Sequence, residues 1–133
     1  DLPMGRRLEI GIEGWATRAG LDVGLTLLEA IGMAEIERYV AGLSERLRAG
    51  LAAMPNCEWL TPRGIGQSSG ITSFMVAGGG EAKTRAVVDG LWERERIFVK
   101  YQIERPMVRV SIAAFNTIDE VDRLLTALEP LVA

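Results

Sequence analysis

The sequence predicts an α/β protein of the α+β type, with a mostly antiparallel sheet of about three to four strands and helices packed on one face. Several long segments place apolar residues at every third or fourth position, which is typical of helices with one buried side. Short apolar or alternating runs lie between them, bounded by Gly and Pro, as strands are. The predicted order is α-α-β-β-α-β-β-α. No linker or internal repeat interrupts the chain, so we expect residues 1–133 to form a single domain.

The first two predicted helices differ in how their apolar residues are spread. The segment from Trp15 to Ile31 is rich in Ala and Leu, and we expect a packed helix. Within it, Gly20 and Gly24 cost some helix stability but let another backbone approach closely. The second helix follows Gly32 and carries a single apolar stripe, with charged residues on its other faces. The residues of the stripe are Ile36, Val40, Leu43, Leu47, Leu51 and Met54.

Four short segments have the composition of strands. They run from Cys57 to Thr61, from Gly70 to Ala77, from Ile97 to Ile103 and from Met107 to Ile112. The second segment alternates between two sides. Ile71, Ser73 and Met75 lie on one side, and Thr72, Phe74 and Val76 lie on the other. Both sides are partly apolar, which predicts a strand that is covered on at least one face.

Two further helices are predicted beside the last strands. The third helix spans Glu81 to Arg96. The residues expected to face inward are Ala82, Ala86, Val87, Leu91 and Trp92. The last helix runs from about Ile118 to Leu131, with Val121, Leu124, Leu125 and Leu128 on one face. It begins at Thr117 and Glu120, which have the spacing of a capping box.

Composition and charge exclude several classes of function. The net charge of -3 offers no basic surface for nucleic acid. No apolar run approaches the ~20 residues that cross a membrane, and the N-terminal residues lack the apolar region of a signal peptide. The single cysteine, Cys57, excludes an internal disulfide and favours a cytoplasmic location. Position 1 is not Met, so we expect the chain to begin inside a longer one.

The residue inventory also limits the chemistry. The chain has no histidine, which excludes a His-based triad, a His metal site and an imidazole base. We expect no metal site. The only lysines are Lys83 and Lys100. Gly64 and Gly66 form a short loop without the wider glycine patterns that bind phosphates, so this loop is interpreted as a turn.

Three segments together resemble a known enzyme family. Residues 6–11 read Arg-Arg-Leu-Glu-Ile-Gly, residues 70–74 read Gly-Ile-Thr-Ser-Phe, and residues 108–128 read VRVSIAAFNTIDEVDRLLTAL. With the order of the elements, they resemble the C-terminal small domain of class V, fold-type I aminotransferases, which use pyridoxal phosphate. The isopenicillin N epimerase-like and cysteine desulfurase-like members are especially similar. The third segment is the most specific of the three.

The resemblance implies roles for three residues. The family's Arg-x-Ser strand provides the arginine that binds the substrate α-carboxylate, and this arginine maps to Arg109; a guanidinium can give a carboxylate two parallel hydrogen bonds. The alternative is a surface arginine on an edge strand, paired with a nearby Glu. Relatives often place an arginine near the active site where Lys100 stands, although a solvated lysine at a strand end is equally consistent. Ile12 replaces the family threonine that contacts the cofactor phosphate of the neighbouring subunit, so the phosphate loses that hydroxyl.

The resemblance also implies that the covalent attachment point of the cofactor is missing. The family carries its Schiff-base lysine in the large domain, and neither Lys83 nor Lys100 has the corresponding motif. We therefore expect pyridoxal phosphate in the parent enzyme and none bound by this chain alone. The desulfurase branch needs a nucleophilic cysteine on the loop after Lys100, where residues 101–105 contain none. Cys57 is expected to be a small buried residue, so the sequence disfavours a cysteine desulfurase.

Two functions are consistent with these observations. In the first, the chain is the C-terminal domain or a fragment of a pyridoxal-phosphate enzyme that acts on an amino acid by transamination, epimerisation or lyase chemistry. It would contribute Arg109 and Lys100 to substrate binding and no catalytic residue, and would be inactive alone. In the second, it is a stand-alone binding or dimerisation module. The first helix and the inner sheet face would expose apolar surface, so we expect a homodimer or association with a large domain.

Overall fold

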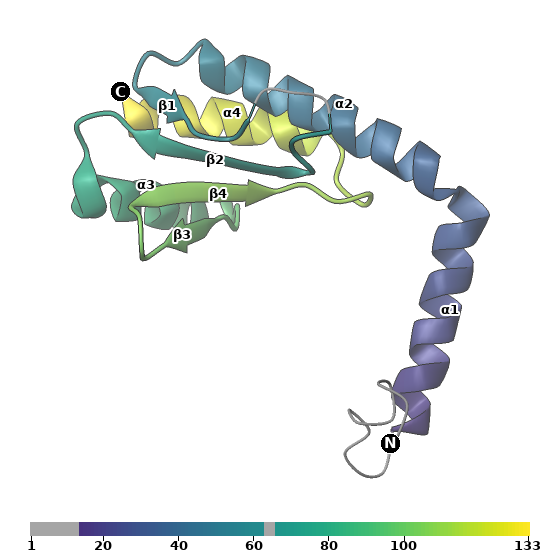
Figure 1. Ribbon diagram of the computed structural model, residues 1–133. Coiled ribbons are helices and arrows are strands. Elements are labelled where there is room, and N and C mark those ends of the chain that lie inside the picture. The colour runs from purple at the N-terminus through teal and green to yellow at the C-terminus, as the bar shows by residue number, and fades with distance from the viewer. Residues whose placement is uncertain (1–13, 63–65) are drawn as a thin grey trace, which may run out of the picture. The chain divides into compact units, whose positions relative to one another are not determined.

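The computed structural model describes residues 14–62 and 66–133. The elements have the predicted order and form an α+β fold (Figure 1). The helices are α1 (Trp15–Ile31), α2 (Met33–Ala52), α3 (Gly80–Glu95) and α4 (Ile118–Val132). The strands are β1 (Cys57–Trp59), β2 (Ile71–Val76), β3 (Lys100–Gln102) and β4 (Met107–Ser111). The chain divides into two compact units, residues 1–35 and 36–133.

The described part of the first unit is mainly helix α1. The helix ends at Gly32, whose positive φ of 91° suits glycine and whose N–H donates to the carbonyl of Leu28 at 2.9 Å. No residue of α1 is buried, and Trp15 and Val23 are 76% and 69% exposed. The predicted helix is confirmed, and its apolar residues are exposed, as expected for the first helix of this chain on its own. No helix in the described ranges has both the length and the apolar content needed to span a bilayer.

The second unit is built on an antiparallel four-stranded sheet with the order β1-β2-β4-β3. Strand β4 therefore lies inside the sheet, between β2 and β3 (Figure 1). Residues on opposite sides of β2 and of β4 differ in burial. Thr72, Phe74 and Val76 of β2 and Val108 and Val110 of β4 are buried. Because neighbouring side chains alternate across a strand, these residues share one face of the sheet.

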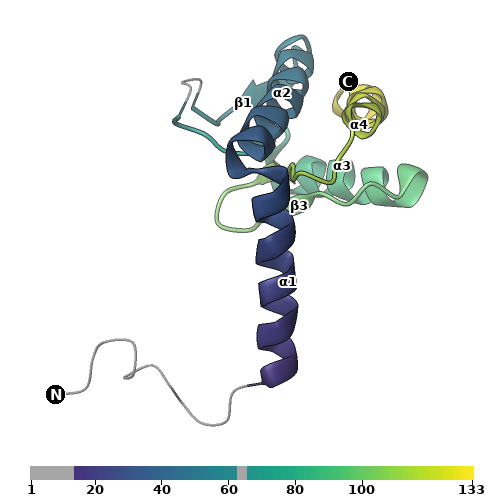
Figure 2. The same ribbon diagram turned by 90° about the vertical axis from the view of Figure 1, so that its right-hand side faces the viewer.

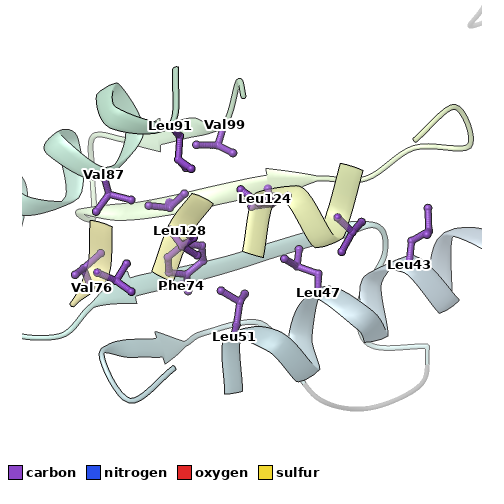
Figure 3. Packing of buried hydrophobic residues seen from close by; sticks show 14 residues of the cluster. Leu43, Leu47, Leu51, Phe74, Val76, Val87, Leu91, Val99, Leu124 and Leu128 are labelled. Atoms are coloured by element: carbon purple, nitrogen blue, oxygen red, sulfur yellow. The ribbon is translucent and has the colours of Figure 1, made fainter. Parts of the chain in front are cut away.

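Three helices of the second unit supply most of the rest of the core. The buried residues come from α2 (Leu43, Leu47 and Leu51), α3 (Val87 and Leu91) and α4 (Val121, Leu124, Leu128 and Val132). They form one apolar cluster with the buried strand residues, and Figure 3 shows side chains from these elements meeting around Phe74. Figure 2 shows α3 and α4 on the same side of the strands. The predicted packing of helices on one face is confirmed, and the expectation that the inner sheet face is exposed is wrong.

Two local predictions on α3 and β3 need correction. Ala82, Ala86 and Trp92 are exposed, whereas Thr84, which was not expected to face inward, is buried. The Thr84 hydroxyl donates to the carbonyl of Gly80 at 2.7 Å, so its polar group is satisfied inside the helix and its methyl group can face the core.

The strand predicted from Ile97 to Ile103 is shorter because α3 ends in a tight cap. Arg96 has a left-handed φ of 55°, and the N–H of Ile97 donates back to the carbonyl of Leu91 at 3.1 Å. This bond removes the Ile97 N–H from any strand pairing. Val99 is buried and packs in the core, but regular pairing with β4 begins only at Lys100.

Helix α4 begins as predicted, at a complete capping box. The Thr117 hydroxyl accepts from the Glu120 N–H at 3.3 Å, and a Glu120 carboxylate oxygen accepts from the Thr117 N–H at 2.9 Å. Asn116 donates to the same carboxylate at 3.1 Å, and its carbonyl accepts from the Tyr39 hydroxyl of α2 at 2.8 Å. The cap therefore fixes both the start of α4 and the loop that follows β4.

Thr117→Ala should lower the free energy of unfolding by about 1 kcal/mol, because it removes the side chain that accepts from the helix N-terminus. Urea denaturation of the variant and of Ser111→Ala, an exposed hydroxyl residue at the end of β4, would check this. Equal midpoints for the two variants would contradict a stabilising cap.

Because of Glu120, the free energy of unfolding should also depend on pH in the acid range. The hydrogen bonds from Thr117 and Asn116 hold the pKa of the folded Glu120 carboxyl below its ordinary value of 4.5. Its contribution to stability is therefore full above 4.5 and is lost as the pH falls through the lowered folded pKa. Glu120→Gln should flatten this acid dependence. An unchanged acid profile for Glu120→Gln would contradict the assignment.

Candidate functional site

The two predicted site residues meet in one row of the sheet. In the strand register, Arg109 of β4 is the direct partner of Lys100 on β3 and of Ser73 on β2. Directly opposed residues in an antiparallel pair point to the same face, with Cβ atoms about 4.5–5.5 Å apart. The ladder therefore places a guanidinium beside an ammonium on one side and a hydroxyl on the other.

This row lies on the face of the sheet opposite the core. Its immediate neighbours along β4, Val108 and Val110, are buried under the helices, so Arg109 points the other way. Arg109 and Ser73 are half-buried and Lys100 is exposed. No helix among residues 36–133 covers this face, which leaves the row open to a ligand or to another part of the protein.

Arg109 does not match the alternative of an edge arginine paired with a glutamate. Its strand is inside the sheet, and no ion pair joins Arg109 or Lys100 to any described residue. The Nε of Arg109 is buried and lacks a hydrogen-bond partner within the described ranges. Buried polar atoms in folded proteins normally have a partner, so this nitrogen is an unsatisfied donor.

The chemistry of the row favours an anion. A guanidinium can hold a carboxylate through two parallel hydrogen bonds, and a neighbouring ammonium adds a second positive charge. The four strands contain one acidic residue, Glu58, which lies opposite Met75 on β1, two strands away from Arg109. The row thus carries two positive charges with no acidic residue directly opposite either of them.

Ser73 was not predicted as a site residue. The alternation of the Gly70–Ala77 segment already placed it on the side away from Phe74, together with Ile71 and Met75. That pattern shows which residues share a face, but only the strand register shows that Ser73 is the one opposite Arg109.

The two lysines lie in different parts of the second unit. Lys83 lies on α3, which packs on the core face, whereas Lys100 lies in the open row with Arg109. Two hollows in the second unit, with volumes of about 240 and 360 Å³, are lined by residues of the α3, β4 and α4 regions. Neither hollow is lined by Lys83, Lys100 or Arg109. Ile12, which replaces the family threonine, lies outside the described residues.

Within residues 14–62 and 66–133, no group of three or more carboxylate or cysteine side chains is placed to hold a metal ion.

Cys57 has the environment of a structural thiol. It is half-buried against the apolar core, and desolvation raises the pKa of its thiol to about 11. The thiolate is the nucleophilic form of cysteine, so almost none is present at neutral pH. Cys57 is also the register partner of the buried Val76, on the face opposite Arg109. It is therefore unsuited to act with the Arg109 row.

Iodoacetamide should alkylate Cys57 slowly in the folded protein at pH 7. The rate should increase as the pH approaches about 11, and urea should restore fast alkylation at neutral pH by exposing the thiol. Mass spectrometry of quenched samples measures the modified fraction. Equally fast alkylation with and without urea at pH 7 would show that Cys57 is a reactive thiol.

Comparison with known proteins shows which family the chain resembles in sequence. The family model for aminotransferase class-V matches residues 3–124. The chain is 28% identical over 137 residues to a probable cysteine desulfurase of Pyrococcus abyssi, covering 95% of this chain and 33% of the relative. It is 32% identical over 103 residues to an isopenicillin N epimerase of Amycolatopsis lactamdurans, covering 76% of this chain and 25% of the relative.

The fold is also similar to solved structures of pyridoxal-phosphate enzymes. The fold matches an apo cysteine desulfurase from Thermococcus onnurineus NA1 with a TM-score of 0.80 and 28% identity, over 95% of this chain and 33% of that protein. It matches a C-DES mutant with glycine covalently linked to its PLP cofactor with a TM-score of 0.78 and 28% identity, over 94% of this chain and 31% of that protein. The chain therefore spans between a quarter and a third of the length of these relatives.

Proposed function

Because this chain belongs to the class-V aminotransferase family, we propose that it is the C-terminal small domain of a larger pyridoxal-phosphate enzyme that acts on an amino acid. Its part is to bind the substrate α-carboxylate through Arg109. The reaction of the whole enzyme is a transamination, an epimerisation or a lyase reaction. The rest of the parent enzyme holds the cofactor, because the family carries its Schiff-base lysine in the large domain. The single unpaired cysteine supports a cytoplasmic location.

The observation that best supports this role is the position of Arg109. It stands inside the sheet on the open face, with Lys100 and Ser73 as direct neighbours and a buried Nε that has no partner in the described chain. An arginine with a structural role would be expected to bond to the backbone or to an acid. Arg48 is an example, since it donates to the Thr72 hydroxyl at 3.2 Å and to the Ser69 carbonyl at 3.0 Å.

L-Alanine, which carries an α-carboxylate and no other acidic group, provides the direct test. We expect it to bind weakly to the isotopically labelled chain and to shift the backbone amides of Arg109, Lys100 and Ser73 together in an NMR titration. L-Alaninamide, which lacks the carboxylate, is the matched control ligand and should shift none of them. Shifts that avoid β4, or that are equal for both ligands, would reject the carboxylate role.

Within the family, we propose a member other than a cysteine desulfurase. The segment after Lys100, residues 101–105, has no cysteine. Cys57 lies on the core side of the sheet with a thiol pKa raised to about 11, so it cannot take over that role.

Exposed apolar residues on α1 favour the second candidate function, a binding or dimerisation module. The large apolar residues exposed on this helix are Trp15, Leu21, Val23, Leu25, Leu27, Leu28 and Ile31. Apolar patches of this kind on soluble proteins usually mark interaction sites. The two functions are compatible, because a small domain can bind substrate and also associate through α1.

Light scattering should therefore find a homodimer or a larger species at high protein concentration. Val23→Lys with Leu27→Lys should shift the distribution towards monomer by placing charges on the exposed helix. Ile103→Lys is the matched control, because Ile103 is an exposed apolar residue outside α1, 77% exposed in the turn after β3. A monomer at all concentrations for the unaltered chain would count against association.

A further inference from the structure

Lys100 and Arg109 form a like-charge pair that the described chain leaves uncompensated. The two residues are direct partners across β3 and β4 and point to the same open face. Like charges directly opposite each other in a sheet are destabilising. No described acidic side chain forms an ion pair with either residue, so their repulsion is not relieved within the described ranges.

We infer that Lys100 determines specificity, by selecting amino-acid substrates that carry a second carboxylate in the side chain. This inference rests on the proposed role of Arg109 in binding the α-carboxylate. A single carboxylate can neutralise one of the two cations. A substrate with two carboxylates would neutralise both, and would also remove the repulsion between them.

The spacing of the strands suits such a ligand. Neighbouring strands lie about 4.8 Å apart, and their directly opposed side chains start from Cβ atoms at a similar separation. The two carboxylates of a short acidic amino acid can bridge that span. The flexible stem of an exposed lysine lets Lys100 reach the second carboxylate, whereas the fork of Arg109 orients the first.

Within the four strands, the residues next to the row provide no competing acid. On the same face, the direct partners in the neighbouring rows are Ser111 with Ile71, and Gln102 with Met107. These residues are neutral, and the acidic Glu58 lies on β1, two strands from Arg109. Three of the helices, α2, α3 and α4, pack on the other face, so their charges do not face the row.

Paired ligands of equal size provide the test. We expect L-glutamate to bind the chain about threefold more tightly than L-glutamine in low-salt NMR titrations, since exposed ion pairs contribute modestly. Added salt should reduce the ratio towards one. Lys100→Gln should abolish the preference, so that L-glutamate and L-glutamine bind with equal affinity. The matched control Lys83→Gln, which removes a lysine on the other side of the sheet, should retain the preference.

The outcomes separate this inference from the proposed function. Equal affinities for L-glutamate and L-glutamine, or a preference that survives Lys100→Gln, would overturn the role of Lys100. Detectable L-alanine binding that depends on Arg109 would at the same time uphold the proposed function. Loss of the preference in Lys83→Gln would show that net charge, not the row, attracts the ligand, and would also overturn the inference.

Discussion

Phe74→Ala is expected to lower the free energy of unfolding by about 3–5 kcal/mol. Phe74 is 1% exposed and is the largest fully buried side chain of the core. It extends from β2 into the cluster formed by α2, α3 and α4, where Figure 3 shows it beside Leu128. Removing the ring loses its transfer free energy and leaves a cavity that the closely packed neighbours can fill only in part. A loss of this size is a large fraction of the stability of a typical domain.

Urea denaturation followed by circular dichroism would measure this loss. Phe98→Ala is the matched control, because it removes the same ring from a side chain that is 84% exposed. We expect the control to change stability by no more than about 0.5 kcal/mol. Similar losses for the two variants would show that the cluster around Phe74 is not the core of this domain.

Arg109→Met is expected to weaken L-alanine binding by about tenfold or more while leaving stability nearly unchanged. Hydrogen bonds to charged groups contribute about 1.5–3 kcal/mol, and a tenfold change in affinity corresponds to about 1.4 kcal/mol. The substitution breaks no hydrogen bond or ion pair to a described residue, so we expect no more than about 0.5 kcal/mol of change in unfolding. Arg109→Lys should be intermediate in binding, since it keeps the charge but loses the fork.

Arg48→Met is the control, because it should lower stability without changing ligand binding. Arg48 anchors the start of β2 through its bonds to Thr72 and Ser69, and its guanidinium stacks on the Trp59 ring at 5.9 Å from the ring centre. Its loss should reduce stability by about 1–3 kcal/mol and leave L-alanine binding unchanged. If instead Arg109→Met destabilised the domain and Arg48→Met weakened binding, Arg109 would be a structural residue.

Most of the architecture was predictable because the strongest patterns agree with the tertiary packing. The stripe of α2 is confirmed by the burial of Leu43, Leu47 and Leu51, and the capping box of α4 forms with both of its hydrogen bonds. In both cases the signal is local, since helical spacing and capping depend on residues a few positions apart.

The predictions that failed depend on contacts between distant segments. The sequence pattern correctly placed Val87 and Leu91 inside, but it did not show that Ala86 and Trp92 turn outward, which depends on how α3 packs on the sheet and α4. Likewise, the apolar run before Lys100 has the composition of a strand. However, at the cap of α3 the Ile97 N–H donates to the carbonyl of Leu91. It therefore cannot pair with β4, and β3 begins only at Lys100.

The sequence alone determined the order of the elements, the family likeness and the identity of Arg109 and Lys100 as candidate site residues. These depend on motifs and on periodicity within short segments. Only the tertiary structure decided that Arg109 is inside the sheet, that Lys100 and Ser73 are its direct partners, and that this row lies opposite the core. The reason is physical: strand order and register are set by side chains that pack across the whole domain, and a shift of one residue would turn Arg109 to the other face.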